Sequence, residues 1–170
     1  MRTLINKIDQ LSEWTGRAAC LLVLPVVLVT VYMVAARYFF HAPTDWGFEF
    51  TIFFYGAYFM LSGAYCLKLD GHVAVDIIAR LLPETGRKIL ALFANLVIFL
   101  FCFILIWMGT RMAWQSTLIL ERSIHQTAFN PQIWWFKWII PVSAFLLMLQ
   151  NLANMLRTIL SFKKQEARAE

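Results

Sequence analysis

Charged residues are scarce in this chain of 170 residues, at 15% of the total, where a typical soluble domain has about 25%. Hydrophobic residues make up 61% of the chain and its mean hydropathy is +0.66. A soluble fold of this length has one ordinary core and cannot bury so much apolar surface. The composition therefore excludes a soluble domain and predicts that lipid surrounds most of the chain.

Histidine and cysteine are also scarce, with three of each. Cys20, Cys66 and Cys102 fall in three different apolar runs without CxxC spacing, so we expect neither a disulfide framework nor a metal site. The histidines lie in the connections between runs, which disfavours the paired axial ligands of a b-type haem. The sequence lacks HExxH, GxSxG and phosphate-loop motifs. We therefore predict a protein that is not an enzyme, with no cofactor and no catalytic, substrate-binding or metal-binding residue of its own.

Four long apolar runs are present instead, at residues 18–36, 50–67, 89–110 and 138–156. Each is long enough to cross a hydrocarbon layer of roughly 30 Å as a helix. Since the runs lack the two-residue alternation of a barrel strand, they predict an all-α integral membrane protein with four transmembrane helices in a single domain, residues 1–170. Pro25 and Pro141 are expected to kink the first and fourth helices.

The basic residues predict the orientation. The net charge of +5 comes from Lys and Arg at the ends of the apolar runs, without the basic stripe that nucleic-acid binding needs. Eleven of the fifteen lie in the N-terminal segment, the second connection and the C-terminal tail. The positive-inside rule then places both termini in the cytoplasm.

Two segments outside the runs have an amphipathic pattern. Residues 1–16 place Leu4, Ile5, Ile8 and Leu11 on one helical face. The connection between the second and third runs also places apolar residues on one helical face before Pro83: Val73, Ile77, Ile78, Leu81 and Leu82. Both patterns predict interfacial helices that lie in the membrane surface and contact its lipids, one at the N-terminus and one between helices 2 and 3.

The four runs contain no Asp, Glu, Lys, Arg or His. Autonomous transporters place such residues, or helices broken by Gly or Pro, near the middle of the membrane. We therefore do not expect this chain to carry solute alone. An autonomous small four-helix transporter or channel, and the membrane-anchor subunit of a redox complex, remain as alternatives.

Polar and small residues beside the runs are candidates for structural or partner contacts. Arg37 and Glu49 flank a tight connection and are close enough in sequence to form an ion pair, to stay unpaired at the interface, or to contact a ligand. Gly56 and Gly63 lie on a small-residue face, which is typical of a packing seam within the chain or with a partner. Three further polar residues near the inner end of the fourth run favour interhelical hydrogen bonds or headgroup contact: Gln150, Asn151 and Asn154.

His72 and Asp76 belong to the motif Gly71-His72-Val73-x-Val75-Asp76 in the second connection. The functional interpretation is a site on the cytoplasmic side, whereas the structural one, which we favour, is the cap and polar face of the interfacial helix.

The order of these motifs resembles the small membrane subunit (DctQ type) of the tripartite ATP-independent periplasmic, or TRAP, transporters. The resemblance rests on Arg37-Tyr38, Trp46 with Glu49, Gly63, the motif ending at Asp76, and Pro131-x-x-Trp134. Phe48 departs from the pattern, because the family often has an acidic residue there.

This resemblance implies a subunit of the bacterial inner membrane with two protein partners. A large multi-spanning permease subunit would hold the sodium and substrate sites, and a periplasmic binding protein would deliver a small organic acid. The chain itself would be a scaffold. Its candidate structural or partner contacts are Arg37, Trp46, Glu49, Gly56, Gly63, His72 and Asp76.

Overall fold

The computed structural model describes residues 2–42, 44–69, 83–124 and 129–169, and this part of the chain is almost entirely helical. Its helices are α1 (Arg2–Leu21), α2 (Val23–Phe39), α3 (Asp45–Lys68), α5 (Glu84–Leu118), α6 (Trp134–Lys137) and α7 (Ile139–Ala169). Four stretches are long and apolar enough to cross a membrane: Ile5–Phe39, Asp45–Lys68, Ile89–Leu118 and Trp134–Leu160. The predicted all-α membrane fold with four spans is thus confirmed.

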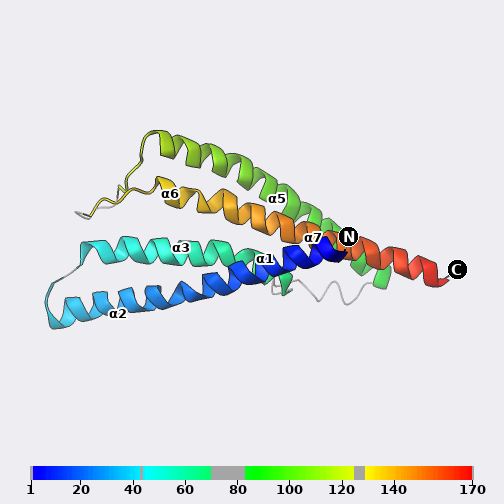
Figure 1. Cartoon of the computed structure of the whole chain (residues 1–170), viewed down its shortest axis with the longest axis horizontal. Helices are drawn as coiled ribbons and strands as arrows, with labels where there is room; N and C mark the ends of the chain where they lie inside the picture. Colours follow the sequence, from blue (N-terminus) through cyan, green and yellow to red (C-terminus); the bar gives the residue numbers. More distant parts are fainter. Residues whose placement is uncertain (1, 43, 70–82, 125–128, 170) are drawn as a thin grey trace.

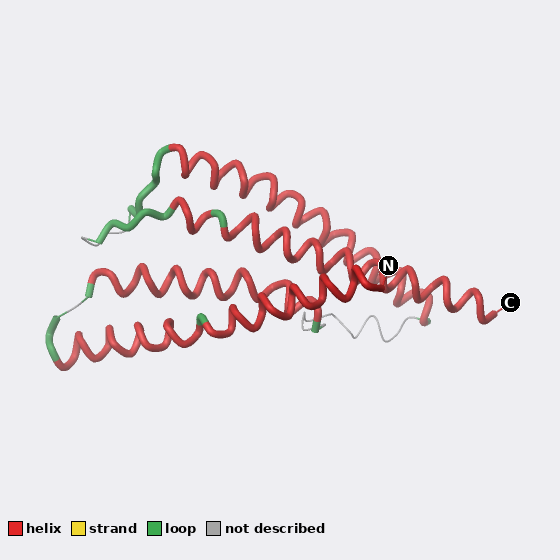
Figure 2. The backbone as a smooth tube through the Cα atoms, in the orientation of Figure 1, coloured by secondary structure: helices red, strands yellow, loops and turns green. Residues whose placement is uncertain are grey.

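Two prolines explain where the first and last spans are interrupted (Figure 2). A proline has no N–H, and its ring clashes with the carbonyl four residues earlier. The residue four before Pro25 is Leu21, where α1 ends, and the residue four before Pro141 is Lys137, where α6 ends. Both helices resume after one residue, so each pair forms a single interrupted span, as the sequence predicted.

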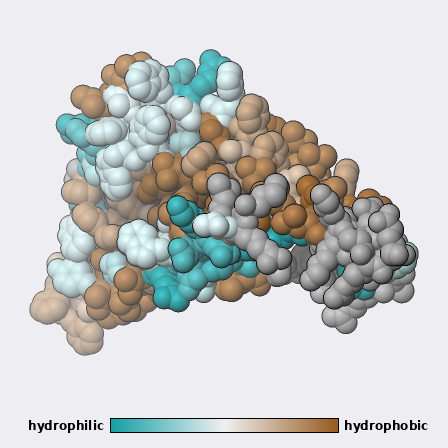
Figure 3. Space-filling view, turned by 45° about the vertical axis from the view of Figure 1, so that its right-hand side comes forward, coloured by the Kyte–Doolittle hydropathy of each residue, from teal (hydrophilic) through white to brown (hydrophobic). Residues whose placement is uncertain are grey.

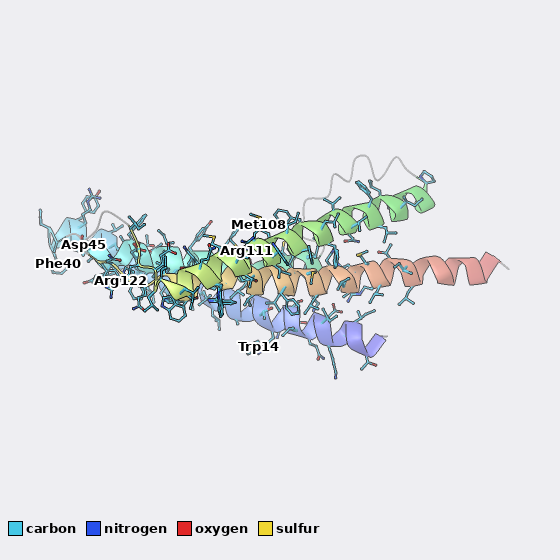
Figure 4. The ribbon with its side chains drawn as sticks, turned by 90° about the horizontal axis from the view of Figure 1, so that it is seen from above. Trp14, Phe40, Asp45, Met108, Arg111 and Arg122 are labelled. Carbon is cyan, nitrogen blue, oxygen red and sulfur yellow. The ribbon has the colours of Figure 1, made fainter. Side chains whose placement is uncertain are left out.

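Near the outer loop, residues 119–133, the spanning helices form a single layer rather than a compact bundle, while α5, α7 and α1 diverge toward the other end (Figure 4). Along the layer the order is α2, α3, α7, α5, with α2 packed mainly on α3 and α5 mainly on α7. Figure 1 shows the helices side by side, and Figure 4 shows that they lie at nearly one level at the end that carries the outer loop. Such a layer leaves large apolar side chains on its outside, and much of the surface in Figure 3 is hydrophobic.

Small residues fill the seams between the helices. The buried apolar set consists largely of alanine and one cysteine: Ala19, Ala36, Ala64, Cys102, Ala113, Ala144 and Ala153. At the α1–α3 seam, a Cβ on Gly16 would lie 2.4 Å from the side chain of Tyr65, so this position has room for glycine alone. Close approach over small residues is how helices pack in lipid, where burying large apolar side chains brings little gain.

The N-terminal segment is helical, and one stripe of it is buried against other helices. Ile5, Ser12, Gly16 and Ala19 face α3 and α7, while Leu11, on the predicted apolar face, stays exposed. The segment continues into the first span. Its position in the membrane surface remains a prediction, and the second interfacial helix lies outside the described residues.

Two helices extend beyond the apolar runs. The third apolar run ends at residue 110, before Arg111, and α5 continues beyond it to Leu118. Likewise α3 begins at Asp45, five residues before the second run. Glu49 and Arg111 therefore lie within the spanning helices, near their outer-loop ends and outside the four apolar runs.

Candidate functional site

Glu49 lies one turn into α3 and is 3% exposed. Its carboxylate accepts a hydrogen bond from the hydroxyl of Ser123 in the outer loop. The loop itself is held by two backbone bonds of 2.9 Å, from the Ser123 amide to the Pro131 carbonyl and from the Ile133 amide to the Glu121 carbonyl. The buried carboxylate thus joins the start of α3 to the outer loop at Ser123.

Arg37 is exposed in the last turn of α2 and makes no hydrogen bond or ion pair with any described residue. The hypothesised clamp with Glu49 is therefore absent from this part of the chain. The reason is rotational: Ala36 is buried, and the next helical residue points about 100° away. A contact of Arg37 with a partner stays a prediction.

Trp46 makes an aromatic contact between α3 and α2. Its ring stacks on Tyr32 of α2 at 5.7 Å between centroids and meets Phe50 edge-on at 5.8 Å. The α2–α3 hairpin is therefore held by aromatic contact, with Trp46 as its centre.

The two glycines of α3 differ in their surroundings. A Cβ on Gly56 would lie 2.6 Å from Cζ of Phe136, whereas a Cβ on Gly63 would meet nothing closer than 3.9 Å, a methyl of Leu147. Phe136 also packs on Phe53, with their centroids 5.1 Å apart. The small-residue face is thus a seam within the chain, and Gly56 is the position where it is tight.

A second anchor of the outer loop is the ion pair between Glu121 and Lys137 of α6. The hydrogen bond from Lys137 lowers the pKa of Glu121 below its ordinary value of 4.5. Next to it, the indole N–H of Trp138 donates to the hydroxyl of Thr117 at 3.0 Å. These bonds tie the end of α5 to the beginning of the last span.

The opposite end of the layer contains a polar network with a buried centre. It is made of Asp9, Ser12 and Glu13 of α1, Lys68 of α3, and Gln150, Asn151, Asn154 and Arg157 of α7. At its centre is Gln150, which is fully buried. Its amide oxygen accepts a bond of 2.7 Å from the Ser12 hydroxyl, and its amide nitrogen donates to Asp9 at 3.0 Å. Asp9 also pairs with Arg157.

The other members of the polar network reach the remaining helices. Asn151 donates to the Asn95 carbonyl of α5 at 2.7 Å, and Asn154 donates to the Leu67 carbonyl of α3 at 3.3 Å. Lys68 pairs with Glu13 at 2.7 Å. The interhelical role predicted for the three amides is confirmed. The partners of Gln150 on α1, Asp9 and Ser12, were not predicted, although they share helical spacing.

The surface has two hollows lined by described residues. One hollow of about 710 Å³ runs along α5 and includes Trp107, Arg111 and Gln115 in its lining. Another of about 550 Å³ lies between α3 and the outer loop and is largely aromatic. Within the described residues no three His, Cys, Asp or Glu side chains are placed to hold a metal ion. His72 and Asp76 lie outside that part of the chain.

The model of the DctQ component of the tripartite ATP-independent periplasmic transporters matches residues 26–161, from α2 into α7. The chain belongs to this family. This DctQ component is therefore a small membrane subunit of a TRAP transporter, it is not an enzyme, and its four spans make it a multi-pass membrane protein. It is also 28% identical over 104 residues to the sialic acid TRAP transporter permease protein SiaT of Haemophilus influenzae (strain 86-028NP). That match covers 61% of this chain and 16% of the relative.

Proposed function

We propose that this DctQ component is the fixed scaffold of a solute importer and holds a large permease subunit in the membrane. The observation that carries the proposal is the polar network, in which buried and half-buried side chains join α1, α3, α5 and α7. Separating those helices would leave buried polar groups without partners, which is costly in a low-dielectric interior. A layer fixed in this way suits the immobile part of a transporter.

In this proposal the sodium and substrate sites belong to the large subunit. The outer loop contributes to the docking surface for a periplasmic binding protein. It is anchored through Glu49 and Glu121, while Arg122 and Ile124 remain exposed, the latter at 91%. This assigns the outer loop to the periplasm and both termini to the cytoplasm of a bacterial inner membrane, in agreement with the positive-inside count.

The proposed cargo is a small organic acid. The name of the similar permease protein gives sialic acid as its substrate, which belongs to that chemical class. Selectivity within the class would reside in the binding protein and the large subunit.

Reconstitution of defined component sets tests the scaffold function. Proteoliposomes with this chain, a large permease subunit, the binding protein and a sodium gradient are expected to accumulate the acid. Those lacking any one protein are expected to remain at background. Uptake by the isolated chain would refute the scaffold and favour an autonomous transporter. Full uptake by the other two proteins without this chain would refute it equally.

A further inference from the structure

The edge of the layer formed by α5 has a regular seam of large side chains that nothing in the described chain covers. The seam consists of Val97, Leu100, Ile104, Trp107, Arg111 and Trp114, which are all exposed. These positions alternate by three and four residues, the spacing that lets one helix pack along another. On the opposite side of α5, Cys102, Gly109 and Ala113 are buried against α7. The seam therefore faces away from the rest of the chain.

Arg111 is the one charged member of this seam. It has no hydrogen-bond or ion-pair partner among the described residues, and neither does the side chain of Gln115, one turn further along. Both line the hollow of about 710 Å³, whose other walls include Phe103, Ile104 and Trp107. A cation and an amide are thus presented on an apolar surface without any group in the described chain to receive their hydrogen bonds.

Arg111 lies deeper in the spanning region than the outer-loop charges do. It is seven residues, or about 10 Å, before the end of α5 at Leu118. In Figure 4, Arg111 lies inward along the long axis from Arg122 and Asp45. Lipid tails offer no acceptor to a guanidinium, and charged residues at this depth characteristically pair with another group. A polar residue at one position of a heptad seam also fixes the partner and its register.

The other edge of the layer differs in this respect. On α2 the exposed residues Leu24, Val27, Leu28 and Val31 are aliphatic, and the Thr30 hydroxyl donates to the Val26 carbonyl of its own helix at 2.7 Å. The exposed polar side chains Arg37 and Tyr38 both lie in the last turn of α2, at the end of the span. The α2 edge is suited to lipid, and the α5 edge to a polypeptide.

We propose that the α5 seam is the docking site for a transmembrane helix of the large permease subunit, and that this helix pairs a carboxylate with Arg111. The inference rests on the proposed scaffold function. It adds which edge of this chain is bound, which of its residues forms the ion pair, and that the pairing group of the partner is negatively charged. It commits to a protein occupant rather than a phospholipid or a second copy of this chain.

Photo-crosslinking of the co-expressed complex tests the choice of edge. A benzophenone amino acid at Ile104 on the α5 seam is expected to give a covalent adduct of the two subunits, while the same probe at Val31 on α2 gives none. Adducts from Val31 alone, or adducts of Ile104 with lipid or with a second copy alone, would overturn the inference.

Charge reversal tests the role of Arg111 in the same complex. Arg111→Glu is expected to reduce the recovered large subunit at least about tenfold, as expected when one member of a buried charge pair is lost. Arg111→Lys should keep most of it, and the control Arg122→Glu, on the outer loop, should keep all of it. Gel filtration checks that each variant is folded. Equal recovery with a folded Arg111→Glu would refute the pairing, whereas failure of the wild-type chain to bind the subunit would refute the scaffold function itself.

Discussion

Replacement of Gln150 by methionine should loosen the attachment of α1 to α7. Gln150 is fully buried, accepts the Ser12 hydroxyl at 2.7 Å and donates to Asp9 at 3.0 Å. Methionine is also unbranched and of similar size, so Gln150→Met removes the hydrogen bonds with little change in packing volume. The variant thus isolates the polar contribution of this residue.

The expected loss of unfolding free energy is about 2 kcal/mol. Ser12 is 2% exposed, so its orphaned hydroxyl should cost about 1–3 kcal/mol. Asp9 retains Arg157, so its share is smaller, about 0.5–1.5 kcal/mol. Interhelical bonds in membrane proteins average only about 0.6 kcal/mol, because the separated helices find other partners. This lowers the expected sum toward the lower end of the range.

Reversible unfolding in mixed micelles, with sodium dodecyl sulfate as denaturant, measures this loss. A double-mutant cycle of Ser12→Ala with Gln150→Met should give a coupling of about 0.6–1.7 kcal/mol. The control is Ser62→Ala. The Ser62 hydroxyl donates to the Phe59 carbonyl of its own helix at 3.0 Å, so its removal should change the free energy of unfolding by less than about 0.5 kcal/mol. If Gln150→Met had wild-type stability and the coupling were zero, the claim that the polar network stabilises the attachment of α1 to α7 would be refuted.

Two further predictions concern packing and pH. Gly56→Ala should destabilise the protein by about 1–3 kcal/mol, because the new methyl would lie 2.6 Å from Phe136. Gly63→Ala should be neutral or slightly stabilising by the same unfolding assay, and the same loss at both positions would contradict this assignment. Acidification should weaken the Glu121–Lys137 anchor. Because the folded pKa of Glu121 is lowered, its stabilising effect is present above pH 4.5 and is lost as the pH falls through that lowered pKa. Melting temperatures between pH 7 and pH 3 should show this loss, and Glu121→Gln should remove that part of the pH dependence.

Hydropathy located the four spans because the thickness of the hydrocarbon sets the length of an uninterrupted apolar run. The ends of the helices follow a different rule. Arg111 marks where charge begins, yet residues 111–118 contain neither proline nor glycine, so the backbone bonds of α5 continue to Leu118. The end of the apolar run is therefore not the end of the helix. The interruptions at Pro25 and Pro141 could be predicted, because they depend on local chain chemistry alone.

The contacts between helices could be predicted only in part. Three amides close together near the end of an apolar run indicate hydrogen bonds to another helix, and Gln150 makes them. Its partners lie 138 and 141 residues away, so they depend on α1 lying beside α7, which no local pattern specifies. The pairing of Arg37 with Glu49 was plausible from spacing alone. It is absent because side-chain direction on a helix changes by about 100° per residue.

The positions of the polar groups separate what fixes the fold from what remains free for a partner. The amide nitrogens of Gln150, Asn151 and Asn154 are engaged within the chain, and Glu49 is buried against the outer loop. A second subunit would have to break internal bonds to use these groups. Arg111 on the α5 edge has no hydrogen-bond or ion-pair partner in the described chain. A second subunit can therefore pair with it without breaking an internal bond. A rigid layer and a strong subunit contact are therefore compatible in one short chain, because they draw on different residues.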